Sequence, residues 1–189
     1  MKKDYNLYFS ISVVLLVSLQ YLLMSVAFND IAISIVGDNP FMSLFGSINN
    51  VILFLFPVLA FLFLVISTTF MLDFFDISYV SSRDVMKLVG FSMLPLLFGM
   101  FFYNLSILFF MQESPQDIKD LADLHFLFDL QIKDFGMINK FCWFVMYYLI
   151  FASLYFKHKL PIYKSLVSTL TPSLLFLMFS YMIKSFGES

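Results

Sequence analysis

The sequence has few of the residues on which disulfide-bonded and water-soluble proteins depend. Its 189 residues include one cysteine, Cys142, and only 13% of them are charged. A single cysteine excludes an internal disulfide framework and any metal site built from several cysteines. Soluble chains carry about 25% charged residues, so this composition is not that of a water-soluble domain. The formal net charge of −2 gives no basis for a nucleic-acid partner.

Apolar and aromatic residues are abundant, in contrast to the charged ones. The chain is 61% hydrophobic and has 27 phenylalanines but only 6 glycines. Soluble chains are about 45–50% apolar, and one of this size has too little interior to bury the excess. Lipid must therefore solvate part of the surface. The connecting segments are too short to hold a second core, so residues 1–189 are expected to form a single transmembrane domain.

Five apolar runs are long enough to cross a membrane. A helix needs about 20 residues to span the hydrocarbon core of a bilayer. The runs lie near residues 8–28, 51–72, 88–111, 141–157 and 163–183, and none has a charged residue in its central part. The sequence therefore predicts an all-α, polytopic transmembrane helix bundle of about five spans.

The orientation follows from the distribution of lysine and arginine. Seven basic residues lie in the N-terminus and the second and fourth connections, against four in the remaining segments and the C-terminus. Cytoplasmic loops carry the excess of basic residues in membrane proteins. We therefore expect a multi-pass protein of the cell (cytoplasmic) membrane, with its N-terminus inside and its C-terminus outside.

Two segments of the expected outer face have patterns of their own. In the acidic segment 112–140, Ser114, Pro115 and Asp117 form a helix-start signature, and apolar residues follow at helical spacing. The sequence predicts an amphipathic outer-face helix over residues 114–134, between the third and fourth spans. Residues 31–36, in the loop expected at 29–50, are too short to span and are interpreted as part of an interfacial or re-entrant element.

Two pairs of side chains are candidates for cation binding or partner contact. His125 and Asp129 lie four residues apart, so one face of the amphipathic helix would present both. A metal ligand set needs further convergent groups, and a plain surface histidine is the favoured interpretation. Asp73 and Asp76 follow the second span. They could bind a cation or form a salt bridge to Arg83 or Lys87 across the short turn, and capping of the cytoplasmic loop with local pairing is the favoured interpretation.

The motifs of known membrane enzymes do not occur in the sequence. HExxH, GxSxG and glycine-rich phosphate loops are all missing, and Cys142 has no histidine near it in sequence. Cys142 is therefore interpreted as structural. We expect no enzyme activity, no catalytic or metal site, and no cofactor.

The polar residues within the spans favour packing over ion coupling. Ionisable groups at bilayer depth mark proton and ion pathways, whereas amides and hydroxyls more often join helices. Gln20 and Asn104 are the first candidates for such helix contacts. Pro57, Pro95 and Pro172 lie inside the second, third and fifth spans, where each is expected to kink its helix and shape the bundle.

Two stretches resemble the Yip domain family of five-span membrane proteins. They are RDVMKLVGFSMLPLLFG, residues 83–99, and KHKLPIYKSLVSTLTP, residues 157–172. The first matches the basic, Gly-aromatic and Leu-Pro features typical of that family's third span, and the resemblance covers residues 5–185. Eukaryotic members bind Rab proteins through a long cytosolic N-terminal region, whereas here about seven residues precede the first span. The resemblance thus implies a short, bacterial-type member, of a group often associated with transport systems.

Three functions remain open on the sequence alone. The leading hypothesis is a non-catalytic accessory subunit of a transport or secretion complex, with other membrane subunits as partners, such as an ATP-driven exporter. The alternative is a small transporter or channel formed by homo-oligomerisation around the kinked spans. A further alternative is an immunity or lipid-modulating protein whose acidic outer segment contacts a toxin or headgroup. The lipid bilayer is a partner in all three.

Overall fold

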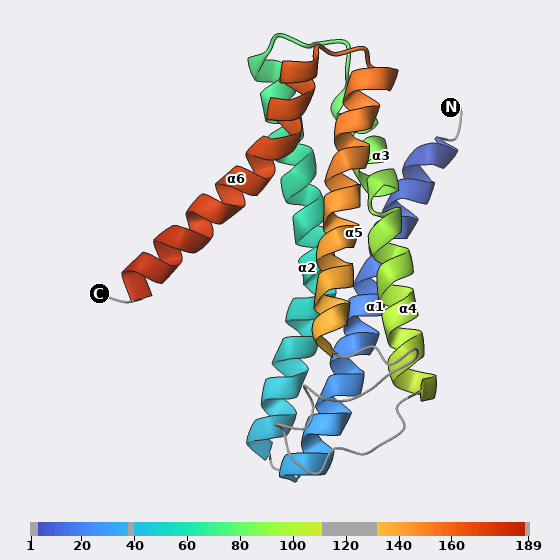
Figure 1. The fold of residues 1–189 in the computed structure, drawn as a ribbon, viewed down its shortest axis with the longest axis vertical. Helices are drawn as coiled ribbons and strands as arrows, with labels where there is room; N and C mark the ends of the chain where they lie inside the picture. Colours follow the sequence, from blue (N-terminus) through green and yellow to red (C-terminus); the bar gives the residue numbers. More distant parts are fainter. Residues whose placement is uncertain (1–3, 38–39, 111–131, 188–189) are drawn as a thin grey trace.

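Helices account for the regular structure of residues 4–37, 40–110 and 132–187, the parts of the chain that the structure describes. In the computed structural model these residues form α1 to α6 and one short π-helical turn, η3, and no strand occurs among them (Figure 1). The all-α prediction is confirmed over these ranges. The amphipathic helix expected at residues 114–134 lies almost wholly outside them.

The first two helices are much longer than the predicted spans. α1 runs over Tyr5–Val36 and α2 over Pro40–Phe74, with 32 and 35 residues. At 1.5 Å per residue α2 is about 52 Å long, which exceeds a hydrocarbon core of about 30 Å. Gly37 ends α1 with φ +87°, a conformation that side chains disfavour. Pro40 opens α2 at the first helical position, where no amide hydrogen is needed.

The prediction of a loop over residues 29–50 is wrong. Residues 31–36 continue α1 and are no separate interfacial or re-entrant element, and α2 has already begun at residue 40. No glycine or proline interrupts the chain between Asp30 and Val36. The helix therefore continues until Gly37, and only three residues separate α1 from α2.

The third predicted span consists of two helices. α3 covers Ser82–Ser92 and α4 covers Leu94–Phe110, with a break at Met93. Ser81 caps α3, because its Oγ accepts a hydrogen bond from the Asp84 amide at 3.2 Å and donates one to Asp84 Oδ2 at 2.7 Å. Pro95 is the second residue of α4, so it marks the start of a helix.

The C-terminal part of the chain contains α5 over Ile132–Ala152, η3 over Ser153–Lys157 and α6 over Ile162–Gly187. In η3 the backbone N–H of His158 donates to the carbonyl oxygen of Ser153, five residues earlier, at 3.2 Å. η3 thus widens the last turn of the fourth span before the chain reverses.

Four helical segments of the described chain are long and apolar enough to cross a membrane. They are Tyr5–Ile31, Pro40–Phe74, Ser82–Ile107 and Asp134–Lys157. Each contains one of the first four predicted spans almost completely. The fifth predicted span coincides with α6, which is helical but is not among these four, so a fifth crossing remains a prediction.

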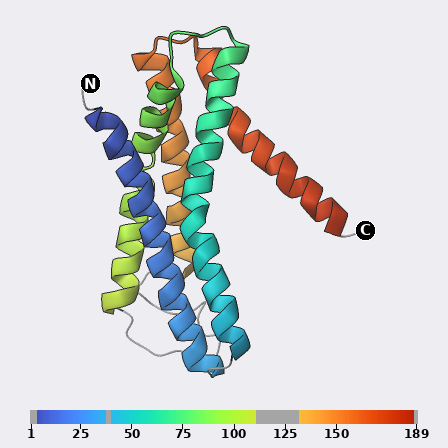
Figure 2. The same ribbon diagram turned by 180° about the vertical axis from the view of Figure 1, so that it is seen from behind.

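The core lies where α1 contacts α2, α3 and α4, with α5 packed against α3 and α4. Val17, Val85, Val89, Met93 and Met146 are fully buried there. α6 contacts α2 and α5, and then leaves the bundle obliquely (Figures 1 and 2). Its C-terminal half stands apart from the other helices in both views.

Candidate functional site

A polar contact between α1 and α4 joins the two residues that the sequence singles out for helix packing. Asn104 Nδ2 donates to Gln20 Oε1 at 2.6 Å and to the Gln20 backbone oxygen at 2.8 Å. Asn104 is only 5% exposed. An amide in hydrocarbon needs such partners, because no water is there to replace them. The structure thus brings Gln20 and Asn104 together.

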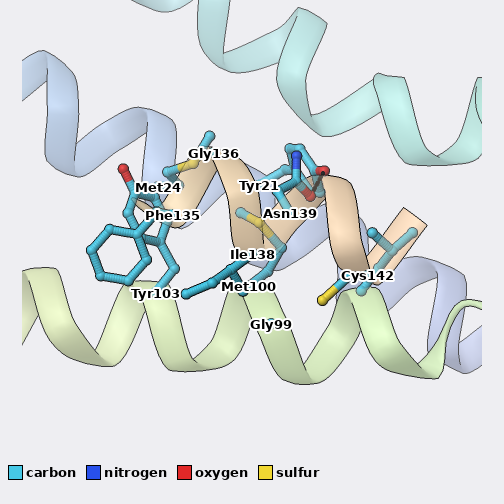
Figure 3. A pocket seen from close by; sticks show the side chains of 11 residues that line it. Tyr21, Met24, Gly99, Met100, Tyr103, Phe135, Gly136, Ile138, Asn139 and Cys142 are labelled. Atoms are coloured by element: carbon cyan, nitrogen blue, oxygen red, sulfur yellow. Dashed lines mark hydrogen bonds between the residues drawn. The ribbon is translucent and has the colours of Figure 1, made fainter. Parts of the chain in front are cut away.

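A second polar contact lies one residue further along α1. Tyr21 donates from its hydroxyl to Asn139 Oδ1 on α5 at 3.3 Å (Figure 3). Tyr21 is 6% exposed, and its ring lies 6.1 Å from that of Phe56. Sequence reasoning missed this pair. Asn139 lies beside Lys140 near the start of its helix, so the sequence does not distinguish it from a surface residue.

The Tyr21–Asn139 contact forms one wall of a cavity of about 200 Å³ between α1, α4 and α5. Figure 3 shows the side chains that surround it, most of them apolar or aromatic. They are Tyr21, Met24, Leu96, Gly99, Met100, Tyr103, Phe135, Gly136, Ile138, Asn139 and Cys142. No charged group is among them, so the lining suits an apolar ligand with at most one or two hydrogen-bonding groups.

Two glycines of this lining have opposite surroundings. A Cβ atom at Gly99 would lie 2.7 Å from Cys142 Sγ, whereas one at Gly136 would meet no atom within 4 Å. Gly99 is therefore needed for the close approach of α4 and α5. Gly136 faces open space, so a side chain there would extend into it without displacing a neighbour.

The α1–α2 pair carries a cluster of amides that sequence reasoning also missed. Asn29 Nδ2 donates to Asn50 Oδ1 at 3.0 Å, and Asn49 Nδ2 donates to Ser25 Oγ at 3.0 Å. Gly46 lies against Asn29, since an added Cβ would be 2.8 Å from Asn29 Nδ2. These contacts hold the ends of the two long helices together near their connection.

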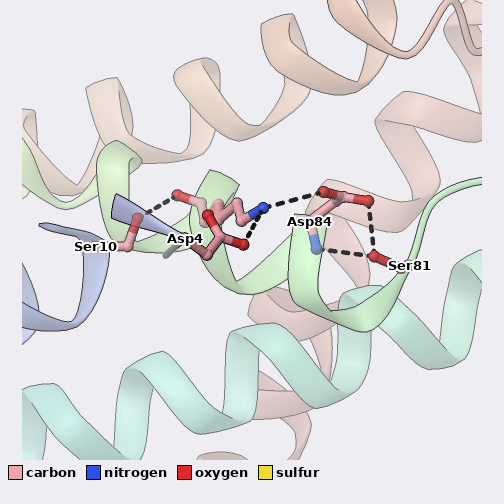
Figure 4. Close-up of polar contacts among 5 residues, drawn as sticks. Asp4, Ser10, Ser81 and Asp84 are labelled. Carbon is pink, nitrogen blue, oxygen red and sulfur yellow. Dashed lines mark hydrogen bonds and ion pairs between the residues drawn. The ribbon is translucent and has the colours of Figure 1, made fainter. Parts of the chain in front are cut away.

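The opposite end of the bundle holds an ion-pair network around Lys87. Lys87 Nζ lies 2.7 Å from Asp4 Oδ2 and 3.7 Å from Asp84 Oδ1 (Figure 4). Ser10 Oγ donates to the Lys87 backbone oxygen at 2.9 Å. This network ties the start of α1 to α3.

The network replaces the ion pairs expected of Asp73 and Asp76. Within the described part of the chain, neither carboxylate pairs with Arg83 or Lys87, so that prediction is wrong. Asp73 is exposed near the end of α2, and Asp76 follows in the turn with φ +57°. The N-terminal end of α1 reaches Lys87 instead, which a reading of neighbouring sequence does not anticipate.

Asp4 and His158 are two of the ionisable groups at this end whose pKa values are shifted, and each shift has a clear cause. The hydrogen bond from Lys87 holds the pKa of Asp4 below its ordinary value. Burial lowers the pKa of His158, and the positive charge of Lys157 lowers it further.

The Lys164 ammonium lies 5.4 Å from the centre of the Phe75 ring and donates to the Phe75 carbonyl oxygen at 3.2 Å. Basic groups thus gather where α2–α3 and α5–α6 connect.

Buried hydroxyls form a further group on α2 and α6. Five side-chain oxygens have no hydrogen-bond partner among the described residues: Ser18 Oγ, Thr68 Oγ1, Thr69 Oγ1, Ser165 Oγ and Ser168 Oγ. Four of the five belong to α2 and α6, which pack against each other. Among the described residues, α2 and α6 thus bury more hydroxyls without a hydrogen-bond partner than α1 does.

The three prolines occupy different positions in their helices. Pro57 is buried inside α2 and Pro172 inside α6, whereas Pro95 lies in the first turn of α4. An interior proline leaves the carbonyl four residues earlier without its amide donor. Leu53 and Ser168 carry those carbonyls, so each marks a weakened turn.

The remaining candidates, His125 and Asp129, lie outside the described residues. Among the residues that are described, no three metal-ligating side chains come together. Cys142 is a free thiol, 8% exposed, and it lies against α4 at Gly99.

The fold and these contacts define a class: a multi-pass helical protein with at least four helices fit to cross a membrane. Comparison with protein-family models, with curated proteins and with solved structures gives no match for this chain.

Proposed function

We propose that this protein is a non-catalytic subunit of a transport or secretion complex in a membrane. The observation that carries the proposal is the position of α6, which packs on α2 at its start and then leaves the bundle (Figure 2). A helix that ends apart from its own bundle gives up helix–helix packing, which another membrane protein can restore.

α6 has an apolar face suited to such a partner. Leu166, Leu170, Leu174 and Met178 recur every four residues and are 48%, 42%, 58% and 64% exposed. We call these four residues the α6 stripe. Ser165 and Ser168 lie on the buried side of the same helix. The α6 stripe therefore points away from α2 and is open to a helix of another subunit.

The orientation of the bundle in the membrane is part of the same proposal. The start of α1, the α2–α3 connection and the α5–α6 connection lie at one end of the bundle (Figure 1). Arg83, Lys87, Lys157, Lys159 and Lys164 belong to this end. By the positive-inside rule it faces the cytoplasm, as does the N-terminus. The resemblance of residues 83–99 and 157–172 to the Yip domain family would imply the same role, because bacterial members of that family are often associated with transport systems.

Purification from the native membrane in mild detergent tests this function. The proposal expects the tagged protein to retain another membrane protein in stoichiometric amount. Alanine at Leu170 and Leu174 should release that protein, whereas alanine at Leu15 and Leu19, equally exposed on α1, should not. A monomer without any partner contradicts the proposal. A pure homo-oligomer that moves a solute after reconstitution contradicts it in favour of a channel.

A further inference from the structure

The cavity between α1, α4 and α5 is lined by three helical segments that are long and apolar enough to cross a membrane. Its α5 residues run from Phe135 to Cys142, which corresponds to about 10 Å along the helix. These residues belong to the first turns of the segment Asp134–Lys157. The cavity is therefore placed where the chains of surrounding lipids can reach it.

The size and lining of the cavity fit a hydrocarbon chain. An apolar cavity of about 150 Å³ in another protein is large enough to bind benzene, and this one measures about 200 Å³. Met24 and Met100 contribute flexible thioether side chains, which adapt to an irregular chain. A drug-sized ligand needs about 300–1,000 Å³, so a larger molecule would not be enclosed.

One hydrogen-bonding group is available on the cavity wall. Asn139 accepts from Tyr21 through Oδ1, and its Nδ2 donates to no group within the described part of the chain. Asn139 lies next to Lys140, an exposed charged residue of the kind that reaches the lipid headgroups. A donor at that level suits a carbonyl at the head of a hydrocarbon chain.

We propose that this cavity holds the first carbons of one acyl chain of a membrane phospholipid, with Asn139 donating a hydrogen bond to its ester carbonyl. The chain runs along α5 from Asn139 toward Cys142, and the exposed Gly136 keeps the entrance open because it has no side chain there. The phospholipid is a resident ligand of the bundle, and its site is distinct from the α6 stripe.

Native mass spectrometry after reconstitution tests the site. The wild-type protein, Gly136→Leu and Met137→Leu are each incorporated into dioleoyl phosphatidylcholine vesicles and then extracted in mild detergent. Met137 is the control, because it neighbours Gly136 but is 62% exposed and does not line the cavity. We expect one retained phospholipid in the wild type and in Met137→Leu, and a several-fold loss in Gly136→Leu. Equal retention in all three proteins overturns the proposal.

Photo-crosslinking with a diazirine on the acyl chain provides a test that needs no variant. Every lipid-facing side chain will react to some extent, including Phe141 and Phe144, which are 65% and 68% exposed. The proposal requires adducts on Met100 or Cys142 as well, which are 5% and 8% exposed. Adducts confined to exposed side chains contradict it, whether or not Gly136→Leu folds.

Discussion

Gly90 and Gly136 are both helical glycines, and their surroundings predict opposite effects of a methyl group. A Cβ at Gly90 would lie 2.5 Å from Ser10 Cβ and 2.9 Å from the Ser10 backbone, whereas one at Gly136 meets nothing. Gly90→Ala should force α1 and α3 apart and destabilise the protein by about 1–3 kcal/mol. Gly136→Ala should raise stability by up to about 1 kcal/mol, because alanine favours a helix. Thermal unfolding in detergent measures both, and a stabilising Gly90→Ala would contradict the close α1–α3 contact.

Gly99 and Cys142 lie against each other where α4 contacts α5 at the cavity. Gly99→Ala should destabilise the protein by about 1–3 kcal/mol, since its Cβ would lie 2.7 Å from Cys142 Sγ. Adding Cys142→Ala removes the obstructing sulfur, so the double variant should regain part of the loss. A double-mutant cycle in thermal unfolding measures this coupling. Strictly additive effects would mean that the two residues do not touch.

The Asn104–Gln20 pair connects α4 with α1. Asn104→Leu keeps a side chain of similar size but removes both hydrogen bonds to Gln20. We expect a loss of about 0.6–2 kcal/mol, the range measured for hydrogen bonds between membrane helices. Ser106→Ala on the same helix is the control, because Ser106 donates only to the Phe102 carbonyl within α4. An equal effect of the two changes would count against a contact between helices.

The Asp4–Lys87 ion pair joins the start of α1 to α3, and its contribution depends on pH. The folded protein holds the pKa of Asp4 below the ordinary aspartate value. The stabilisation is therefore present above the unfolded pKa of about 4 and is lost as pH falls through the folded pKa. Asp4→Asn should lower the unfolding temperature at pH 7, and the difference from wild type should vanish at low pH. A difference that does not change with pH would show that Asp4 acts without its charge.

At the level of elements, the sequence predicts well whatever depends on local patterns. Long apolar runs locate the four helices that can cross a membrane, because burial in lipid requires length and apolar composition alone. The interpretation of residues 31–36 as a separate element is wrong because a run too short to span can still continue a longer helix, and nothing in the sequence ends α1 before Gly37.

Contacts between elements depend on geometry that the sequence does not state. Polar residues within spans are candidates for contacts between helices, and the sequence indicates Gln20 and Asn104 for that reason. Their pairing with each other follows only from the positions of α1 and α4. Lys87 pairs with Asp4, 83 residues away in sequence, and with Asp84 in its own helix, but among the described residues it does not pair with Asp73 or Asp76. The cavity needs three helices to form and leaves no pattern in any one of them.

For the whole molecule, the position of α6 is the feature that distinguishes a self-contained bundle from a subunit of a larger complex. The other helices bury apolar side chains against one another around α1, whereas the end of α6 stands apart (Figure 1). A helix end that gives up packing within its own bundle is expected where a helix of another protein belongs.

Photo-crosslinking from the α6 stripe in the native membrane tests this claim most directly. A photoreactive phenylalanine analogue replaces Leu174 in one protein and Leu15 in another, side chains that are 58% and 52% exposed. If α6 binds another subunit, we expect position 174 to crosslink to one discrete protein other than this chain. Position 15 should give only lipid adducts. Lipid adducts alone at both positions would contradict it and leave α6 a helix that simply faces the bilayer.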